Sequence, residues 1–235
     1  MFNLIPVAHA EEIAQTWFDT AFESVAEVPG WGWLLMIALL AGGFLAYRSL
    51  RSSGKTFWTA RTMSVGAMCM ALASVLSLIK LWTMPMGGAI TPASMLPLLL
   101  FAYCYGTLPG LTLGALYGVM QYLLDGMRFA ALGAIPNLLD YPIAFGLLGL
   151  AGLFGKLDNQ KLSLTLGFVL GCFGRFLASF TSGYVYYGMY APEGWNPAVY
   201  SIVYNGTYLL PECIICIALG LLIAPRLVRE LRRLK

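Results

Sequence analysis

The chain has 235 residues, of which 59% are hydrophobic and 11% charged, and its formal net charge is +3 at pH 7. Soluble domains carry roughly 25% charged residues, so this composition excludes a soluble globular protein and predicts an integral membrane protein. Regular apolar–polar alternation over about ten residues, the pattern of a membrane barrel, is absent. We therefore predict an all-α membrane protein.

The N-terminal part of the chain contains one apolar segment that stands apart from the others. Residues 1–30 lack a basic start and a full-length apolar core, so we expect no cleaved signal peptide and treat them as an extracytoplasmic segment. Residues 31–62 then read as an additional transmembrane helix at 31–47, followed by a basic cytoplasmic linker.

The rest of the chain, 63–235, contains six apolar spans separated by short polar segments. Most of these spans approach the ~20 residues that cross a bilayer, but one has only about a dozen and must be shielded by its neighbours. The predicted spans are 63–81, 94–105, 108–124, 138–154, 163–183 and 198–224. The sequence thus predicts a six-helix membrane domain preceded by one extra helix.

Basic residues near the span ends predict the orientation, because cytoplasmic loops carry an excess of lysine and arginine. They gather after the first span, between the fifth and sixth predicted helices of the whole chain, and at the C-terminus. These residues are Arg48, Arg51, Lys55, Arg61, Lys156, Lys161, Arg226, Arg229, Arg232, Arg233 and Lys235. Seven alternating spans put all of them in the cytoplasm and the N-terminus outside.

The same alternation places segments 84–93, 125–137 and 184–197 outside. Glycine and proline make them irregular, and they could act as lids over an outward-facing site or serve only as turns. No nucleotide-binding loop, metal-ligand spacing or nucleophile–base pair is visible, so we expect no enzyme, no cofactor, no metal site and no nucleic-acid partner. The five cysteines all lie in apolar spans, where thiols behave as small hydrophobes.

The last span carries polar groups along one face. An asparagine–proline pair at 196–197 predicts its start, with the asparagine as N-cap and proline at the first helical position. Asn205, Tyr208 and Glu212 then share a helix face, and a tyrosine stripe at i, i+4 spacing begins at Tyr200. Such a stripe is typical of an interfacial aromatic belt or of helix packing. The deeper asparagine and glutamate favour a binding pocket.

The preceding span contains Arg175 and Ser179 one helical turn apart. A charged group inside a bilayer costs about 2–4 kcal/mol unless it lines a cavity or has a partner. The sequence leaves open whether Arg175 pairs directly with Glu212, and whether the two are structural or contact a substrate.

Asp140 and Tyr141 stand at the predicted outer start of their span. One interpretation is helix capping, because a carboxylate in the first helical turn is stabilised by the helix dipole. The other is a carboxylate that faces a cationic or amine-bearing ligand, flanked by aromatic rings. Asp140, Ser179 and Tyr200 all fall near the outer surface, so we expect them to converge on an outward-facing small-molecule site.

The first helix of the main bundle has alanines at 67 and 71, a small-xxx-small pattern that lets another helix approach closely. By itself this pattern is common in alanine-rich spans.

Four stretches of the chain together resemble a known family. They are MPMGGAITPASMLPLLL (84–100), LLDYPIAF (138–145), GRFLASFTSG (174–183) and YAPEGWNPAVYSIVYNGTYLLPE (190–212). From about Met63 to its end, the chain resembles the thiamine-specific substrate-binding subunits, or S-components, of energy-coupling factor (ECF) transporters.

This resemblance implies a six-helix membrane subunit, not an enzyme, that binds thiamine or a thiamine-related precursor at its outer face. An ECF energising module, made of a transmembrane coupling subunit and ATPases, would dock through Ala67 and Ala71. The substrate-binding positions implied here include Ser179 and Tyr187, where family members have a histidine and a large aromatic residue. The full set is Asp140, Tyr141, Ser179, Tyr187, Tyr200 and Asn205.

Two alternatives remain open at this point. The chain could be a solitary or ion-coupled vitamin carrier in which Arg175 and Glu212 form a relay. It could also be a structural membrane subunit without a transport role, which would account for the additional helix at 31–47.

Overall fold

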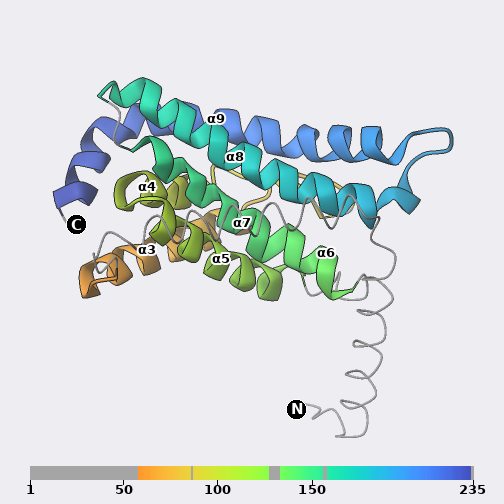
Figure 1. The fold of residues 1–235 in the computed structure, drawn as a ribbon, viewed down its shortest axis with the longest axis horizontal. Coiled ribbons are helices and arrows are strands. Elements are labelled where there is room, and N and C mark those ends of the chain that lie inside the picture. Colours follow the sequence, from red (N-terminus) through yellow and green to blue (C-terminus); the bar gives the residue numbers. More distant parts are fainter. Residues whose placement is uncertain (1–57, 86, 127–132, 156–157, 234–235) are drawn as a thin grey trace, which may run out of the picture.

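The computed structural model describes residues 58–85, 87–126, 133–155 and 158–233. The predicted extra helix at 31–47 and the segment before it lie outside the described residues. Figure 1 shows the described part as a layered bundle of helices with one small strand pair. The predicted all-α architecture is confirmed, and each of the six predicted spans after residue 62 corresponds to a helical segment.

The helical segments follow one another with short connections. They are α3 (Ala60–Leu78), α4 (Leu96–Tyr105), α5 (Thr107–Leu124), α6 (Ala134–Leu138), the π-helical η2 (Leu139–Ile143), α7 (Ala144–Leu147), the 3₁₀-helical η3 (Leu148–Phe154), α8 (Gln160–Val185), the short 3₁₀ turn η4 (Gly188–Tyr190) and α9 (Pro197–Arg233). Within the described residues, four helical runs are long and apolar enough to cross a membrane: 60–78, 134–154, 160–185 and 197–224.

Helix α4 is the short span that the sequence predicted to be shielded, and this prediction is confirmed. All ten of its residues are buried, and it packs against α3, α5, η3 and α9. A ten-residue helix spans only about 15 Å, too little to cross a bilayer alone, so its neighbours must enclose it.

Helices α8 and α9 lie side by side along the length of the bundle and are joined at one end by a loop (Figure 1). The predicted start of α9 is confirmed, because the helix begins at Pro197 and Asn196 Oδ1 accepts a hydrogen bond from the backbone N–H of Ala198 at 2.8 Å. This pair of long helices forms one wall of the bundle.

The helical run that contains Asp140 starts earlier than the sequence predicted. It begins at Ala134 after Gly133, whose φ of 99° ends the preceding loop, and the predicted outer loop 125–137 is therefore shorter. Asp140 lies in the second turn of this run, so the helix-capping interpretation is wrong. Pro142 has no N–H to donate to the preceding turn, which accounts for the π-helical geometry of η2.

Two glycines allow α5 to lie against this run. A Cβ on Gly118 would collide with the carbonyl oxygen of Tyr141, and one on Gly114 would collide with that of Phe145. Backbone contact at this distance is open only to glycine. The glycines of α5 therefore fix the position of η2 and of the Asp140–Tyr141 pair that it carries.

The predicted irregular loop 84–93 forms part of a small hairpin. Strands β1 (Trp82–Thr83) and β2 (Ala89–Ile90) pair antiparallel. The backbone N–H of Gly88 donates to the hydroxyl of Tyr204 at 3.3 Å, and a side chain at Gly88 would collide with the ring of Tyr208. The hairpin thus lies against the tyrosine stripe of α9.

Helix α3 begins at Ala60, so Arg61 belongs to its first turn and not to the preceding linker as predicted. Thr59 caps the helix, accepting a hydrogen bond from the N–H of Thr62 on its side-chain oxygen at 3.2 Å. The start of α3, the start of α8 and the C-terminus lie at one end of the bundle, and the α8–α9 loop lies at the other (Figure 1).

Candidate functional site

One cavity collects every substrate-binding residue that the sequence predicted. Its walls come from the end of α3, the hairpin, η2, α8 and α9. The predicted residues in its lining are Asp140, Tyr141, Ser179, Tyr187, Tyr200 and Asn205. The predicted convergence of Asp140, Ser179 and Tyr200 is therefore present in the fold.

The carboxylate of Asp140 is held from the neighbouring helix. Ser182 Oγ, on α8, donates a hydrogen bond to Asp140 Oδ2 at 2.8 Å. The side chain is partly buried and faces the cavity. A carboxylate can accept several hydrogen bonds, so Asp140 retains acceptor capacity for a ligand cation or amine.

Aromatic rings form most of the remaining outer wall. Tyr141 contacts Tyr122 edge to face with ring centroids 5.6 Å apart. The tyrosine stripe on α9 is continuous: the ring centroids of Tyr200 and Tyr204 are 5.8 Å apart, and those of Tyr204 and Tyr208 are 6.0 Å apart. Burial, followed by the nearby Asp140 carboxylate, raises the pKa of Tyr187, so its phenol keeps its proton at neutral pH.

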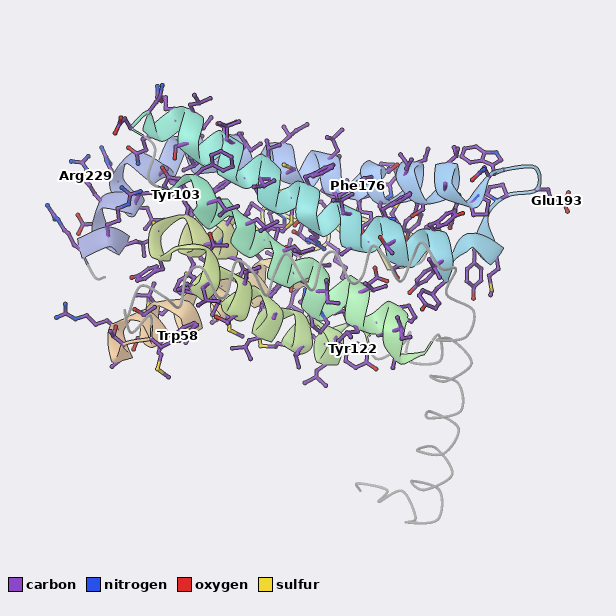
Figure 2. All side chains as sticks on the ribbon, in the orientation of Figure 1. Trp58, Tyr103, Tyr122, Phe176, Glu193 and Arg229 are labelled. Carbon is purple, nitrogen blue, oxygen red and sulfur yellow. The ribbon has the colours of Figure 1, made fainter. Side chains whose placement is uncertain are left out.

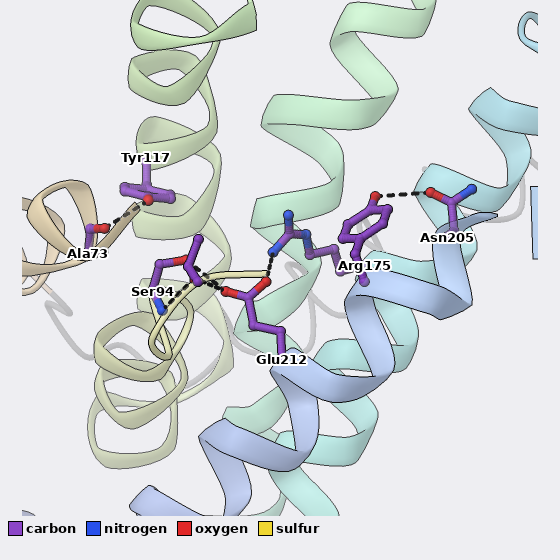
Figure 3. A network of polar contacts seen from close by, with 8 residues as sticks. Ala73, Ser94, Tyr117, Arg175, Asn205 and Glu212 are labelled. Atoms are coloured by element: carbon purple, nitrogen blue, oxygen red, sulfur yellow. Dashed lines mark hydrogen bonds and ion pairs between the residues drawn. The ribbon is translucent and has the colours of Figure 1, made fainter. Parts of the chain in front are cut away.

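Asn205 joins the two long helices where they border the cavity. Its Nδ2 donates to the carbonyl oxygens of Ser179 and Ser201, at 3.2 and 3.0 Å. Its Oδ1 accepts from the hydroxyl of Tyr208 at 3.0 Å, the bond drawn in Figure 3. The side chain is almost fully buried. Asn205 therefore fixes the tyrosine stripe relative to α8.

The inner end of the cavity contains the ion pair that the sequence left open. Arg175 Nη1 lies 3.9 Å from Glu212 Oε2, and the guanidinium stacks on the ring of Phe145 with 4.1 Å between its Cζ and the ring centroid. Figure 3 shows Arg175 and Glu212 pointing toward one another from α8 and α9. The predicted face shared by Asn205, Tyr208 and Glu212 is confirmed by their common burial.

Sequence reasoning missed the partners that complete this inner end. Thr91 Oγ1 and Ser94 Oγ both donate to Glu212 Oε1, the second at 2.8 Å. The two hydroxyls follow the hairpin and lie more than a hundred residues from Glu212 in the chain. The spacing T-x-x-S indicates a local turn, in which the backbone N–H of Ser94 donates to Thr91 Oγ1 at 3.1 Å, but it gives no sign of a distant carboxylate.

A second ion pair, also missed, borders the cavity between α3 and α5. Lys80 Nζ lies 2.9 Å from Asp125 Oδ2, and both side chains are partly exposed. Because Lys80 follows the C-cap residue of α3 and Asp125 is the C-cap of α5, the pair joins the two helix ends at the hairpin side of the cavity. Its two charges cancel.

The remaining charges in the cavity do not cancel. Among the described residues that line it, the acidic and basic side chains beyond Lys80 and Asp125 are the carboxyl groups of Asp140 and Glu212 and the guanidinium of Arg175. With all of them ionised, one negative charge is left over. A buried net charge is costly without a counter-charge, so the cavity is suited to a ligand with one positive charge.

Comparison with known proteins identifies the family. The model of the thiamine transporter protein family (Thia_YuaJ) matches residues 63–231, more than half of the chain. The chain belongs to this family. It is 34% identical over 161 residues to the thiamine transporter ThiT of Bacillus subtilis, an alignment that covers 63% of the chain and 82% of that protein.

A further relative agrees with this assignment, and a solved structure shows the same fold. The thiamine transporter ThiT of Lacticaseibacillus paracasei is 31% identical over 147 residues, which covers 57% of the chain and 73% of that protein. A solved structure of ThiT from Listeria monocytogenes has the same fold, with a TM-score of 0.61 at 22% identity, over 74% of the chain and 96% of that structure. Family membership and the long apolar helices make the chain a multi-pass membrane protein.

In this member of the thiamine transporter family, Ala67 and Ala71 lie away from the cavity. Both are exposed on α3. They share their face with exposed apolar side chains, among them Met68, Leu72 and Val75. Because the two alanine side chains are small, another helix can approach this face closely at their positions.

Proposed function

We propose that the chain is the membrane-embedded subunit that binds thiamine or a thiamine-related precursor for uptake. The observation that carries this proposal is the tyrosine-walled cavity of a thiamine transporter family member, whose described lining holds one more carboxyl group than basic side chains. Both named relatives are thiamine transporters, which supports the same ligand class here.

The chemistry of thiamine fits the lining of the cavity. Thiamine carries one permanent positive charge on its thiazolium ring and an amino group on its pyrimidine ring, and both rings are flat. In the proposed complex, Asp140 pairs with the cationic or amino part of the ligand. The rings of Tyr141, Tyr187 and Tyr200 stack on it and contribute cation–π attraction of about 0.5–2 kcal/mol each. Ser179 and Asn205 supply hydrogen bonds.

We propose further that the cavity opens outward in the cell membrane, with the N-terminus outside and the C-terminus in the cytoplasm. The basic residues of α9 after Ala224 and Lys161 at the start of α8 support this orientation, because they gather at the end of the bundle remote from the cavity. The hairpin and the segment 184–197 then cover the bound ligand from the outside.

The energy for uptake is proposed to come from a separate ECF energising module. The described part of the chain has no nucleotide-binding loop in its sequence, and a carrier of this kind performs no chemical reaction itself. The face of α3 around Ala67 and Ala71 is exposed and carries these two small side chains one turn apart, which suits close contact with a helix of the transmembrane coupling subunit.

The direct test is calorimetric titration of the full-length protein, purified in detergent, with thiamine. We expect saturable one-to-one binding, and native mass spectrometry of the same sample detects any ligand retained through purification. Absence of binding and of any thermal shift with thiamine would overturn the proposal and favour a structural subunit. If cells that lack an energising ATPase module still take up thiamine through this protein, a solitary or ion-coupled carrier would instead be favoured.

A further inference from the structure

Two cysteines from different helices meet where α8 and α9 pack against each other. Cys172 belongs to α8 and Cys213 to α9, and their thiols share a hydrogen bond. Both thiols are free; the first is buried and the second is partly exposed. Two thiols in contact meet the first requirement for a disulfide, because the bond forms only between cysteines that are close in space.

The register of the two helices also places these cysteines opposite each other. The helices are joined by a loop at one end and run antiparallel (Figure 1). On one side of the thiols, Arg175 Nη1 lies 3.9 Å from Glu212 Oε2. On the other side, a Cβ on Gly220 would lie 2.7 Å from the ring of Phe168. Each cysteine lies between these two contacts in its own helix, so the contacts hold the thiols at their present spacing.

Cys213 stands at the edge of the outer surface of α9. Leu210 and Ile214, on the same side of the helix, are exposed apolar residues. Cys213 itself does not line the cavity that contains Asp140, so its exposed part faces the surroundings of the bundle. Both cysteines of the pair lie well inside the apolar runs 160–185 and 197–224. A reagent that reaches them from the membrane must therefore dissolve among the lipid acyl chains.

The third thiol in this region does not have the same access. Cys216, one turn further along α9, is fully buried in the hydrophobic core. Oxidation of cysteines follows their exposure as well as their thiolate character. Of the three thiols, Cys213 is therefore the one that an oxidant meets first, and Cys172 is the thiol in contact with it.

We propose that Cys172 and Cys213 form a reversible thiol–disulfide site that reacts with lipid-soluble organic hydroperoxides. Cys213 Sγ attacks an oxygen of the hydroperoxide, the O–O bond breaks, and the alcohol leaves with the thiol proton. Cys213 is then a sulfenic acid, and Cys172 Sγ attacks its sulfur, so that an S–S bond forms and water leaves. The two thiols lose two electrons, which reduce the hydroperoxide, and an added dithiol restores them by exchange.

This disulfide would join α8 to α9 next to the Arg175–Glu212 pair. A cross-link between distant parts of a chain stabilises the folded state, chiefly by restricting the unfolded one. We therefore expect the oxidised protein to melt several degrees higher than the reduced protein. The inference does not rest on the proposed function, because neither the site nor its test involves thiamine.

The test uses the full-length protein in vesicles of saturated phosphatidylcholine and phosphatidylglycerol, treated with cumene hydroperoxide. Saturated lipids are chosen because they do not themselves consume the oxidant. Peptide mass spectrometry under non-reducing conditions should find the Cys172–Cys213 disulfide, and dithiothreitol should remove it. Thermal unfolding with and without dithiothreitol measures the shift in melting temperature. Cys216→Ser, the matched control one turn away on α9, should form the same disulfide.

Variants of the pair separate its two steps. Cys172→Ser and Cys213→Ser should each lose the disulfide and the rise in melting temperature. Cys172→Ser should in addition keep Cys213 as a sulfenic acid that dimedone captures.

The wild-type protein alone can overturn the proposal, so the folding of the variants does not limit the test. Five free thiols after treatment would overturn it, and so would a disulfide between any other two cysteines. A wild-type sulfenic acid on Cys213 that never proceeds to a disulfide would show that the two thiols do not react with each other. Each of these results leaves the proposed function unaffected.

Discussion

At the scale of single residues, the site is defined by where its charges stand. Asp140 faces the cavity from the π-helical segment η2, and Ser182 holds its carboxylate from α8. Arg175 and Glu212 lie at the inner end and face each other. Among the described residues, the Asp140 carboxylate takes part in no ion pair, which suits it to bind a cationic ligand.

Replacing Asp140 by asparagine tests this role. Asp140→Asn keeps the size of the side chain and its bond to Ser182 but removes the charge, so we expect thiamine affinity to fall by about 1.5–3 kcal/mol, the range for a hydrogen bond to a charged group. Calorimetry of the purified variant measures the change. Asp158→Asn, at an exposed position before α8, is the matched control. An unchanged affinity in Asp140→Asn would remove this residue from the site.

At the scale of elements, the cavity depends on how closely α5 approaches η2. Gly118 lets the helix backbone lie directly against the carbonyl of Tyr141. The same helix holds α3 through its Tyr117, whose hydroxyl donates to the carbonyl oxygen of Ala73 at 3.2 Å (Figure 3). Helix α5 therefore positions both the Asp140–Tyr141 pair and the helix that precedes the hairpin.

A methyl group at Gly118 should disturb this contact. In Gly118→Ala the new Cβ meets backbone, which cannot move aside as a side chain can, so we expect a loss of about 1–3 kcal/mol in stability together with weaker thiamine binding. Thermal unfolding and calorimetry measure the two effects. Gly206→Ala, with nothing within 4 Å of its Cβ, should instead gain about 0.5–1 kcal/mol. Equal melting temperatures for the two variants would contradict this account.

The exposed face of α3 has its own prediction, which concerns assembly. Ala67→Trp combined with Ala71→Trp places two large rings on the exposed face of α3, outside the cavity. We therefore expect thiamine binding to persist and co-purification with the energising module to be lost. Ala218→Trp, at an exposed alanine of α9, is the control for a bulky residue on another lipid-facing helix. Assembly that survives the double change would show that the module docks elsewhere.

At the scale of the whole molecule, the two ends of the bundle differ in charge and in chemistry. Figure 2 shows Arg229 at the end that also holds the C-terminal part of α9, and Glu193 in the loop at the opposite end. At the basic end, Arg232 of α9 links this helix to the end of η3, because its Nη2 donates to the carbonyl oxygen of Gly155 at 2.7 Å. This asymmetry underlies the proposed orientation, in which the basic end faces the cytoplasm.

Labelling of introduced cysteines tests the orientation. Glu193→Cys and Asp158→Cys place a thiol at exposed positions on the two opposite ends. In intact cells, a membrane-impermeant maleimide should modify the first variant only, and both should react after the membrane is opened. The five native cysteines are buried or only partly exposed, and the unmodified wild-type chain serves as the background. The reverse pattern of labelling would invert the proposed topology.

The positions of the helices and the shared face of α9 can be predicted from the sequence alone, because both depend on residues close together in the chain. Apolar length specifies the helices, the asparagine–proline pair specifies the start of α9, and helical spacing puts Asn205, Tyr208 and Glu212 on one face. The family resemblance pointed to the residues that line the cavity.

Only the tertiary structure decides the rest, since it depends on contacts between distant parts of the chain. The hydroxyls of Thr91 and Ser94 meet Glu212 across more than a hundred residues, and no local pattern predicts such a meeting. The helical run begins at Ala134, so Asp140 lies in its second turn and not at the capping position that the sequence allowed. The close backbone contact of this run with the glycines of α5 involves residues distant in sequence, and no local pattern predicts it. Residue pattern determined which polar groups the membrane helices carry, and packing decided which of them share a cavity.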